Sequence, residues 1–388
     1  MSTPPSSERS ASRERSSRLP ARPGIAGMEP YGAPQLDVPH LLNVNENPYP
    51  PSAEVVETIA RDVAAAAGGL NRYPNREFLA LRSDLADYLA TESGVRVAPE
   101  QVWAANGSNE VMLHLLQAFG GPGRAALSFA PTYSMYPEYA RDTLTEWIAG
   151  RRETDFTVDP DVATAAVLEH QPSVILLTSP NNPTGTTLPS STVRAVCEAA
   201  LAVDVDGAPA VVVVDEAYGE FRRDGVPSAM ELLSTYPNLA VSRTMSKAFA
   251  LAGARVGYLA ASRDLVDVLR VVRLPYHLSA VTQAVARAAL KHSATLLAQV
   301  DALRAERDAT VEWLRSRQLA GVPLEVADTD ANFVLFGSFD DRHAVWQGLL
   351  DRGVLIRETG PDGWLRVSIG TPQDMVAFKD ALVEVAGL

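Results

Sequence analysis

The chain has 388 residues and a formal net charge of −13, and hydrophobic residues make up 46% of it. This length predicts two to three domains with ample core. The acidic balance argues against a nucleic-acid-binding surface as the main function. No apolar run approaches the roughly 20 residues that a membrane helix needs. The single cysteine, Cys197, excludes an intrachain disulfide and fits a reducing compartment, so we expect a cytoplasmic protein. The histidines lack metal-ligand spacing, and we expect no metal site.

The composition divides the chain into four segments. Residues 1–27 are rich in Ser, Arg and Pro, which predicts a disordered tail. Residues 28–68 predict an N-terminal arm and a helix, which we expect to pack with the small domain. In residues 69–278, short β-branched runs alternate with helical segments, as in a largely parallel sheet covered on both faces. Residues 279–388 predict a smaller α+β domain.

The expected elements follow in chain order. We expect helices at 53–67, 77–91, 111–119, 190–202, 280–290 and 294–317, and a helix at the C-terminus. We expect strands at 102–105, 125–129, 174–178, 210–214, 239–242, 256–260, 333–336, 354–356 and 365–369.

Lys247 follows an expected strand and lies between small and hydroxyl residues, with Arg255 eight positions later. A solvated surface lysine is the ordinary interpretation of a Ser-Lys pair. However, a desolvated lysine near a positive charge has a neutral amine that can form a Schiff base with an aldehyde. Thr244, Ser246 and Arg255 could together hold a phosphate. An aldehyde that also carries a phosphate indicates pyridoxal 5′-phosphate (PLP).

Two turns after expected strands could contribute to such a site. Ser108 and Asn109 follow Gly107 where a strand turns into a helix, and helix N-termini attract phosphate. The same residues are also ordinary helix caps. Asn182 lies in the segment 179–185, whose composition fits a tight turn. Its amide would nevertheless stand where ligands of α/β sheets bind.

Asp215 directly follows the apolar run 211–214. A carboxylate at the end of a buried strand is costly unless it is paired, and a protonated ring nitrogen is a suitable partner, although a helix cap is an alternative role. Tyr218 and Asn182 could both donate to a phenolic oxygen. Tyr133 could stack on a flat ring or belong to the core.

These residues in this order are more specific than any one of them. The motifs Asn-Pro-Thr-Gly (182–185), Asp-Glu-Ala-Tyr (215–218) and Ser-Lys-Ala-Phe (246–249) resemble those of the fold-type I PLP-dependent aminotransferases, class II-like branch, from about Tyr31 to the C-terminus. Within this branch the sequence is most similar to the histidinol-phosphate aminotransferase family, through the segments 45–48, 71–74, 107–110, 243–247 and 274–277. The resemblance implies an α/β fold, with a large domain around a mostly parallel seven-stranded sheet flanked by helices, and a small α+β domain.

The resemblance also implies a role for each matching residue. Lys247 would form the Schiff base with PLP and move a proton, and Asp215 would hold the ring nitrogen. Asn182 and Tyr218 would bind the phenolic oxygen, and Tyr133 would stack on the ring. The cofactor phosphate would be held by Ser108, Asn109, Thr244, Ser246, Arg255 and Tyr73, the last from the other subunit of a homodimer. The substrate would contact Tyr31, Asn45, Arg357 and Arg366.

The implied reaction converts L-histidinol phosphate and 2-oxoglutarate into imidazole acetol phosphate and L-glutamate, in histidine biosynthesis. Glu29 departs from the family pattern, because many relatives carry a basic residue there, and a glutamate could weaken a phosphate site. An aromatic (phenylalanine) aminotransferase of the same fold would use the same cofactor residues. A PLP-dependent decarboxylase of a phosphorylated amino acid is a further alternative. A PLP-sensing transcriptional regulator would need a DNA-binding module ahead of residue 28.

Overall fold

The computed structural model describes residues 20–22 and 24–388, and it divides between Leu36 and Asp37 into two compact units. In the first unit, the N–H groups of Ile25 and Ala26 donate to the Arg22 carbonyl at 3.0 and 3.1 Å and form a turn. Tyr31 belongs to this unit. Most of the predicted tail, residues 1–19 and 23, lies outside the described residues.

The second unit is built around a seven-stranded sheet in the order β2-β8-β7-β6-β5-β3-β4. Its strands are β2 (Val102–Ala105), β3 (Ala125–Ala130), β4 (Glu146–Arg151), β5 (Val174–Thr178), β6 (Val211–Asp215), β7 (Leu239–Thr244) and β8 (Gly257–Ala261). Strands β4, β3, β5, β6 and β7 are parallel, whereas β8 is antiparallel to both β7 and β2. Every residue of β5, β6 and β7 is buried, as expected for strands covered on both faces. The predicted, mostly parallel sheet is confirmed.

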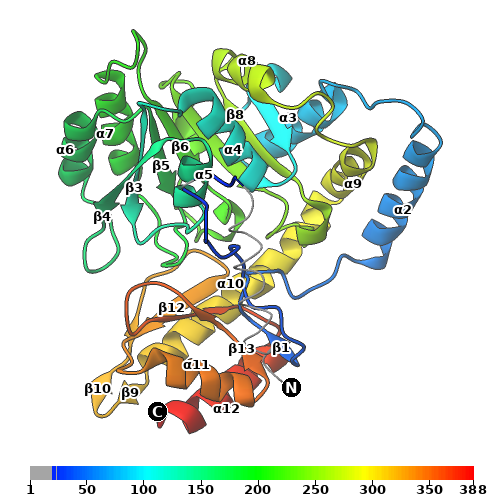
Figure 1. Ribbon diagram of the computed structural model, residues 1–388. Helices are drawn as coiled ribbons and strands as arrows, with labels where there is room; N and C mark the ends of the chain where they lie inside the picture. Colours follow the sequence, from blue (N-terminus) through cyan, green and yellow to red (C-terminus); the bar gives the residue numbers. More distant parts are fainter. Residues whose placement is uncertain (1–19, 23) are drawn as a thin grey trace. The chain divides into compact units, whose positions relative to one another are not determined.

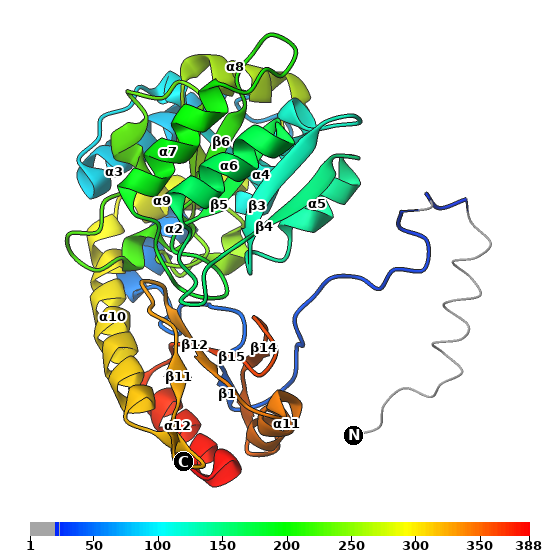
Figure 2. The same cartoon turned by 90° about the vertical axis from the view of Figure 1, so that its left-hand side faces the viewer.

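Helices cover this sheet. They are α3 (Leu79–Ser93), α4 (Ser108–Phe119), α5 (Tyr136–Asp142), α6 (Pro160–His170), α7 (Ser190–Leu201) and α8 (Arg263–Val272). Figure 2 shows α6 and α7 side by side over one face, where α7 packs on β6. Helix α4 packs on β2, β7 and β8. No helix within the described part of the chain is long and apolar enough to cross a membrane.

The C-terminal part contains a smaller, antiparallel sheet in the order β11-β12-β15-β14. These strands are β11 (Glu325–Val326), β12 (Phe333–Gly337), β15 (Leu365–Ser368) and β14 (Arg357–Glu358), accompanied by a β9 (Gln318–Leu319) and β10 (Val322–Pro323) pair and by the helices α11 (Arg342–Asp351) and α12 (Pro372–Ala386). The long helix α10 (Ser293–Arg315) runs from the larger sheet to this one (Figure 1). This part is therefore α+β, as predicted.

Two elements of the segment after Leu36 pack against later parts of the chain. Strand β1 (His40–Leu41) pairs in parallel with β13 (Val354–Leu355). Helix α2 (Ala53–Ala67) packs against α9 (Ala280–Leu290). The Ser52 hydroxyl accepts from the Val55 N–H, and Gly68 follows the last turn of α2, as expected for this helix. The domain boundaries at residues 28, 69 and 279 stay predictions.

Candidate active site

The carboxyl-terminal ends of β5, β6 and β7 meet at one edge of the large sheet. Asp215, the last residue of β6, is in register with Thr178 on β5 and Ser242 on β7. Lys247 follows β7 by three residues. Ligands of open α/β sheets bind at this edge, so the residues predicted from separate motifs occupy a common ligand-binding position.

Lys247 has an environment that favours its neutral amine. Its Nζ donates to the Val44 carbonyl at 2.9 Å and lies 6.0 Å from the centre of the Tyr218 ring. Removal from water lowers the pKa of Lys247 to about 8, with Arg366 and Arg255 acting in the same direction and Glu46 against them. A lysine with this pKa is a nucleophile and a proton acceptor near neutral pH.

Asp215 is a buried carboxylate that hydrogen-bonds to neutral groups. Only 4% of the residue is exposed, and burial raises its pKa to about 6. Its Oδ2 accepts from the Tyr136 hydroxyl at 3.0 Å, and its Oδ1 accepts from the Ala217 N–H at 3.2 Å. Because burial penalises this charge, a cationic ligand atom beside Asp215 would relieve the penalty. The protonated ring nitrogen of PLP is such an atom.

Asn182 and Tyr218 come together as predicted. The Asn182 Nδ2 lies 3.5 Å from the Tyr218 hydroxyl, and Asn45 Nδ2 donates to the same hydroxyl at 2.9 Å. The side-chain oxygen of Asn182, Oδ1, accepts from Arg366. The side-chain amides of Asn45 and Asn182 and the Tyr218 hydroxyl thus lie near Lys247. They can donate hydrogen bonds to a phenolic oxygen of a ligand.

The N-terminus of α4 faces Arg255 at very short range. Gly107 has a φ of 91°, and a Cβ added there would lie 2.5 Å from a terminal nitrogen of Arg255. A Cβ on Gly257 would collide with the backbone nitrogen of Ser108. Arg255 also donates to the Ser246 hydroxyl at 3.4 Å. The Ser246 hydroxyl accepts a second hydrogen bond, from the Thr244 hydroxyl, at 3.0 Å. Helix N–H groups, a guanidinium and two hydroxyls suit a phosphate group.

The other two tyrosines predicted to contact the cofactor lie in different settings. Tyr133 is half-buried, and its hydroxyl lies 3.4 Å from Asn109 Oδ1, which joins it to the start of α4. Tyr73 is 80% exposed, and its ring stacks on Tyr276 with 4.4 Å between centroids. An aromatic side chain this exposed can reach a second molecule.

Arg357 and Arg366 lie directly opposite each other on β14 and β15. Residues directly opposite each other on neighbouring strands point to the same face of the sheet. Two like charges in such positions repel each other and destabilise the sheet. Arg366 is buried and donates to the Asn43 carbonyl at 2.8 Å. Two adjacent cations at the margin of a lysine site are suited to anionic ligands, since guanidinium groups bind carboxylate and phosphate through paired hydrogen bonds.

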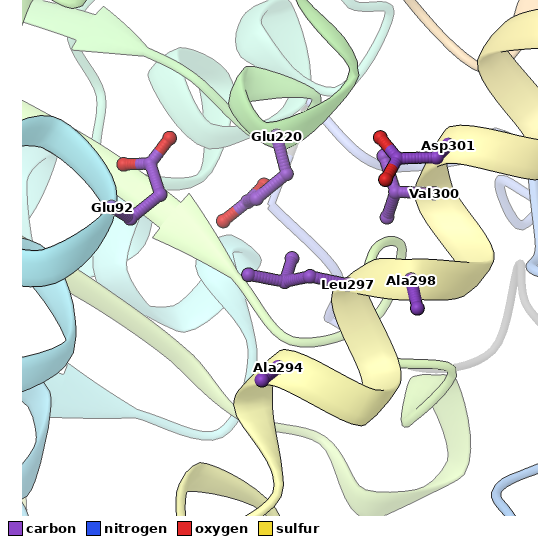
Figure 3. Close-up of a pocket in the computed structure, with 7 residues that line it drawn as sticks. All are labelled: Glu92, Glu220, Ala294, Leu297, Ala298, Val300 and Asp301. Atoms are coloured by element: carbon purple, nitrogen blue, oxygen red, sulfur yellow. The ribbon is translucent and has the colours of Figure 1, made fainter.

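A separate cavity of about 310 Å³ lies between α10 and two carboxylates, Glu92 and Glu220 (Figure 3). None of the predicted site residues lines it. The same carboxylates form ion pairs with the buried Arg243 at 3.1 and 3.2 Å, and Glu216 does so at 2.7 Å. Because Glu216 follows Asp215 and Arg243 lies on β7, this cluster fixes the strand ends that carry the site.

Comparison with known proteins identifies the family. The model of the family described as aminotransferase class I and II matches residues 39–382. The chain belongs to this family. A histidinol-phosphate aminotransferase from Thermobifida fusca is 61% identical over 369 residues, which cover 95% of this chain and 96% of that protein. One from Bifidobacterium adolescentis is 58% identical over 372 residues, 95% of each chain.

A solved structure shares the fold of this aminotransferase. The histidinol-phosphate aminotransferase from Sinorhizobium meliloti, in complex with pyridoxal 5′-phosphate, has a TM-score of 0.79 at 22% identity and covers 96% of this chain and 98% of that one. Class I and II aminotransferases are PLP-dependent enzymes, and the cofactor and reaction type predicted from the sequence are confirmed.

Several residues of the site lie outside the motifs that the sequence shows. Tyr136 and the Val44 carbonyl contact Asp215 and Lys247 directly. Ser368 and Asn332 hold Asn45. The position of Tyr136 three residues after Tyr133 could have indicated a second tyrosine at this strand end. The other contacts join distant segments and leave no local signal.

Proposed function

We propose that this aminotransferase converts L-histidinol phosphate and 2-oxoglutarate into imidazole acetol phosphate and L-glutamate, a step of histidine biosynthesis. The observation that carries the proposal is the pair Arg357 and Arg366 beside the lysine site, since the two substrates carry a phosphate and carboxylates. The identity of 61% to a protein of this name supports the same substrate.

The residues at the sheet edge fit PLP, which supplies an electron-accepting ring when bound. Asp215 would hold the ring nitrogen in its cationic form, because this contact would offset the cost of the buried carboxylate. Asn182 and Tyr218 would bind the phenolic oxygen, and Tyr133 would contact the ring. The phosphate would be held by Ser108, Asn109, Thr244, Ser246, Arg255 and the partner's Tyr73.

Lys247 moves the proton. Near its pKa of about 8, the Nζ can accept a proton from the substrate Cα and release it again, which is the proton movement that amino transfer needs. Its hydrogen bond to the Val44 carbonyl, at 2.9 Å, keeps the amine beside the Tyr218 ring before a ligand enters.

The two arginines divide the anionic groups of the substrates between them. Arg366 binds the carboxylate of glutamate or 2-oxoglutarate, because it is buried and already tied to Asn182. Arg357 binds the phosphate of histidinol phosphate, and the substrate contact of Tyr31, a residue of the first unit, stays a prediction. Both substrates use the pocket in turn, so the keto product leaves before the second substrate enters.

Oligomeric state and location are part of the same proposal. Tyr73, at 80% exposed, supports a homodimer in which each subunit completes the other's phosphate site. The relatives are biosynthetic enzymes, and we expect the enzyme to work in the cytoplasm with small-molecule substrates.

Substitution of Arg357 tests the substrate. Arg357→Ala should raise the KM for histidinol phosphate by roughly 10- to 100-fold, the usual range for a charge-assisted hydrogen bond, and change the KM for phenylalanine little. Arg352→Ala, an arginine paired with Glu384 on the surface, is the matched control. Equal losses on both substrates would favour the aromatic aminotransferase.

A further inference from the structure

Asn45 is engaged through all four of its polar groups. Its N–H donates to the Ser368 hydroxyl at 2.8 Å, and that hydroxyl donates to Asn45 Oδ1 at 2.9 Å. The carbonyl of Asn45 accepts from Asn332 Nδ2 at 3.1 Å, and its Nδ2 donates to Tyr218 at 2.9 Å. Only 2% of Asn45 is exposed. A side chain held this fully is suited to orienting Tyr218.

The backbone of Asn45 is also special. Its φ is 57°, in the left-handed region that asparagine and glycine tolerate better than other residues. This turn places the preceding carbonyl, Val44, 2.9 Å from Lys247 Nζ. Asn45 therefore influences two residues of the site. Its backbone conformation positions the Val44 carbonyl that Lys247 contacts, and its side chain donates to the Tyr218 hydroxyl.

The groups that hold Asn45 come from the small sheet. Ser368 and Arg366 are two residues apart on β15, so their side chains point to the same face. Asn332 precedes β12, the strand paired with β15. The strand that carries the proposed carboxylate ligand therefore also carries the residue that holds Asn45.

We propose that Ser368, Asn332 and Asn45 form a positioning relay that fixes the direction in which the Tyr218 hydroxyl donates its proton. The inference rests on the proposed cofactor site. A tyrosine hydroxyl has one donor and two acceptor positions. Asn45 and Asn182 both donate to the Tyr218 oxygen, at 2.9 and 3.5 Å. With PLP bound, Tyr218 would direct its hydroxyl proton to the phenolic oxygen.

The relay has a consequence for the protonation of the bound cofactor. A hydrogen bond from Tyr218 would stabilise negative charge at the phenolic oxygen and would therefore favour the deprotonated form of the bound cofactor. A misdirected hydroxyl would therefore raise the pH midpoint of the cofactor's absorption change. The other charged groups that act on Lys247 are Arg366, Arg255 and Glu46, which the relay variants leave in place.

The test is a spectroscopic pH titration of the PLP-bound enzyme. Ser368→Ala removes both contacts to Asn45, while Ser368→Thr keeps a hydroxyl. Asn45→Gly removes the side chain but tolerates the positive φ. Ser316→Ala, which removes an exposed hydroxyl bonded to the Trp313 carbonyl, is the matched control.

We expect Ser368→Ala and Asn45→Gly to raise the midpoint by roughly 1 to 2 pH units, as for the loss of one hydrogen bond to the charged form. Ser368→Thr and Ser316→Ala should titrate like the wild type. An unchanged midpoint in Asn45→Gly would overturn the relay, even if Ser368→Ala fails to fold. Amino transfer from histidinol phosphate by the wild type is a separate readout. If it fails while the midpoint moves, the relay stands and the substrate assignment is wrong.

Discussion

Replacement of Asp215 by Asn should stabilise the enzyme without PLP and impair it with PLP. The Asp215 side chain is almost fully buried and hydrogen-bonds to Tyr136 and Ala217, so its charge is carried at a cost. Asparagine has the same shape, and the Tyr136 hydroxyl can rotate to accept from the new amide. The substitution removes the charge while it keeps the packing.

The magnitude follows from the pKa. A folded pKa of about 6 against the ordinary value of 3.8 corresponds, at 1.36 kcal/mol per unit, to about 3 kcal/mol of destabilisation once the group is ionised in both states. Asp215 is neutral in both states below about pH 3.8, so the penalty is absent there. It grows as the pH rises through the folded pKa and is constant above it. We expect Asp215→Asn to gain about 3 kcal/mol at pH 8 and about half of that at pH 5.

Urea unfolding of the PLP-free protein at several pH values measures this gain. Asp330→Asn is the matched control. Burial works against the charge of Asp330, but hydrogen bonds from Arg223 hold its pKa below the ordinary value, so this variant should lose stability at pH 8. With PLP present, Asp215→Asn should bind the cofactor more weakly and transfer amino groups slowly. A gain that does not change between pH 5 and pH 8 would refute the reasoning about Asp215.

Further outcomes can be tested with purified protein. Lys247→Ala should abolish amino transfer and the absorption band of lysine-linked PLP; near wild-type turnover would contradict the role of Lys247. The rate at which the PLP-free enzyme links PLP should rise about tenfold per pH unit below the Lys247 pKa of about 8 and level off above it, since the neutral amine reacts. Gly107→Ala should weaken PLP binding by roughly tenfold or more, because the new Cβ meets Arg255 at a strained φ. Gly253→Ala, whose Cβ would meet nothing within 4 Å, should bind PLP normally.

The sequence was sufficient to predict the large sheet and the residues at its edge, because the strand signals there are strong. Strands β5, β6 and β7 are short apolar runs, and polar motifs follow each of them directly. Because the carboxyl ends of parallel strands lie at the same edge of a sheet, these motifs are expected to lie close together. The strand β4 (Glu146–Arg151) was not predicted, because this edge strand is partly exposed and polar and has only a weak apolar signal.

Contacts between distant segments could not be predicted in the same way. Ser368 lies 323 residues from Asn45 along the chain, and Tyr136 lies 79 residues from Asp215. Hydrogen bonds of this kind depend on how the two sheets pack. The helix α4 begins at Ser108, three residues before the predicted helix, because the glycine at its N-cap adopts a positive φ that a periodicity pattern does not reveal.

A half-reaction of the PLP form shows which compound is the amino donor. The PLP form of the enzyme is mixed separately with histidinol phosphate, phenylalanine and glutamate, and conversion to the pyridoxamine form is followed by absorbance. We predict rapid conversion with histidinol phosphate and glutamate, and slow conversion with phenylalanine, because only the first two carry an anionic group that two atoms separate from the reacting carbon and that the Arg357 and Arg366 pair can bind. Faster conversion with phenylalanine than with histidinol phosphate would contradict the account.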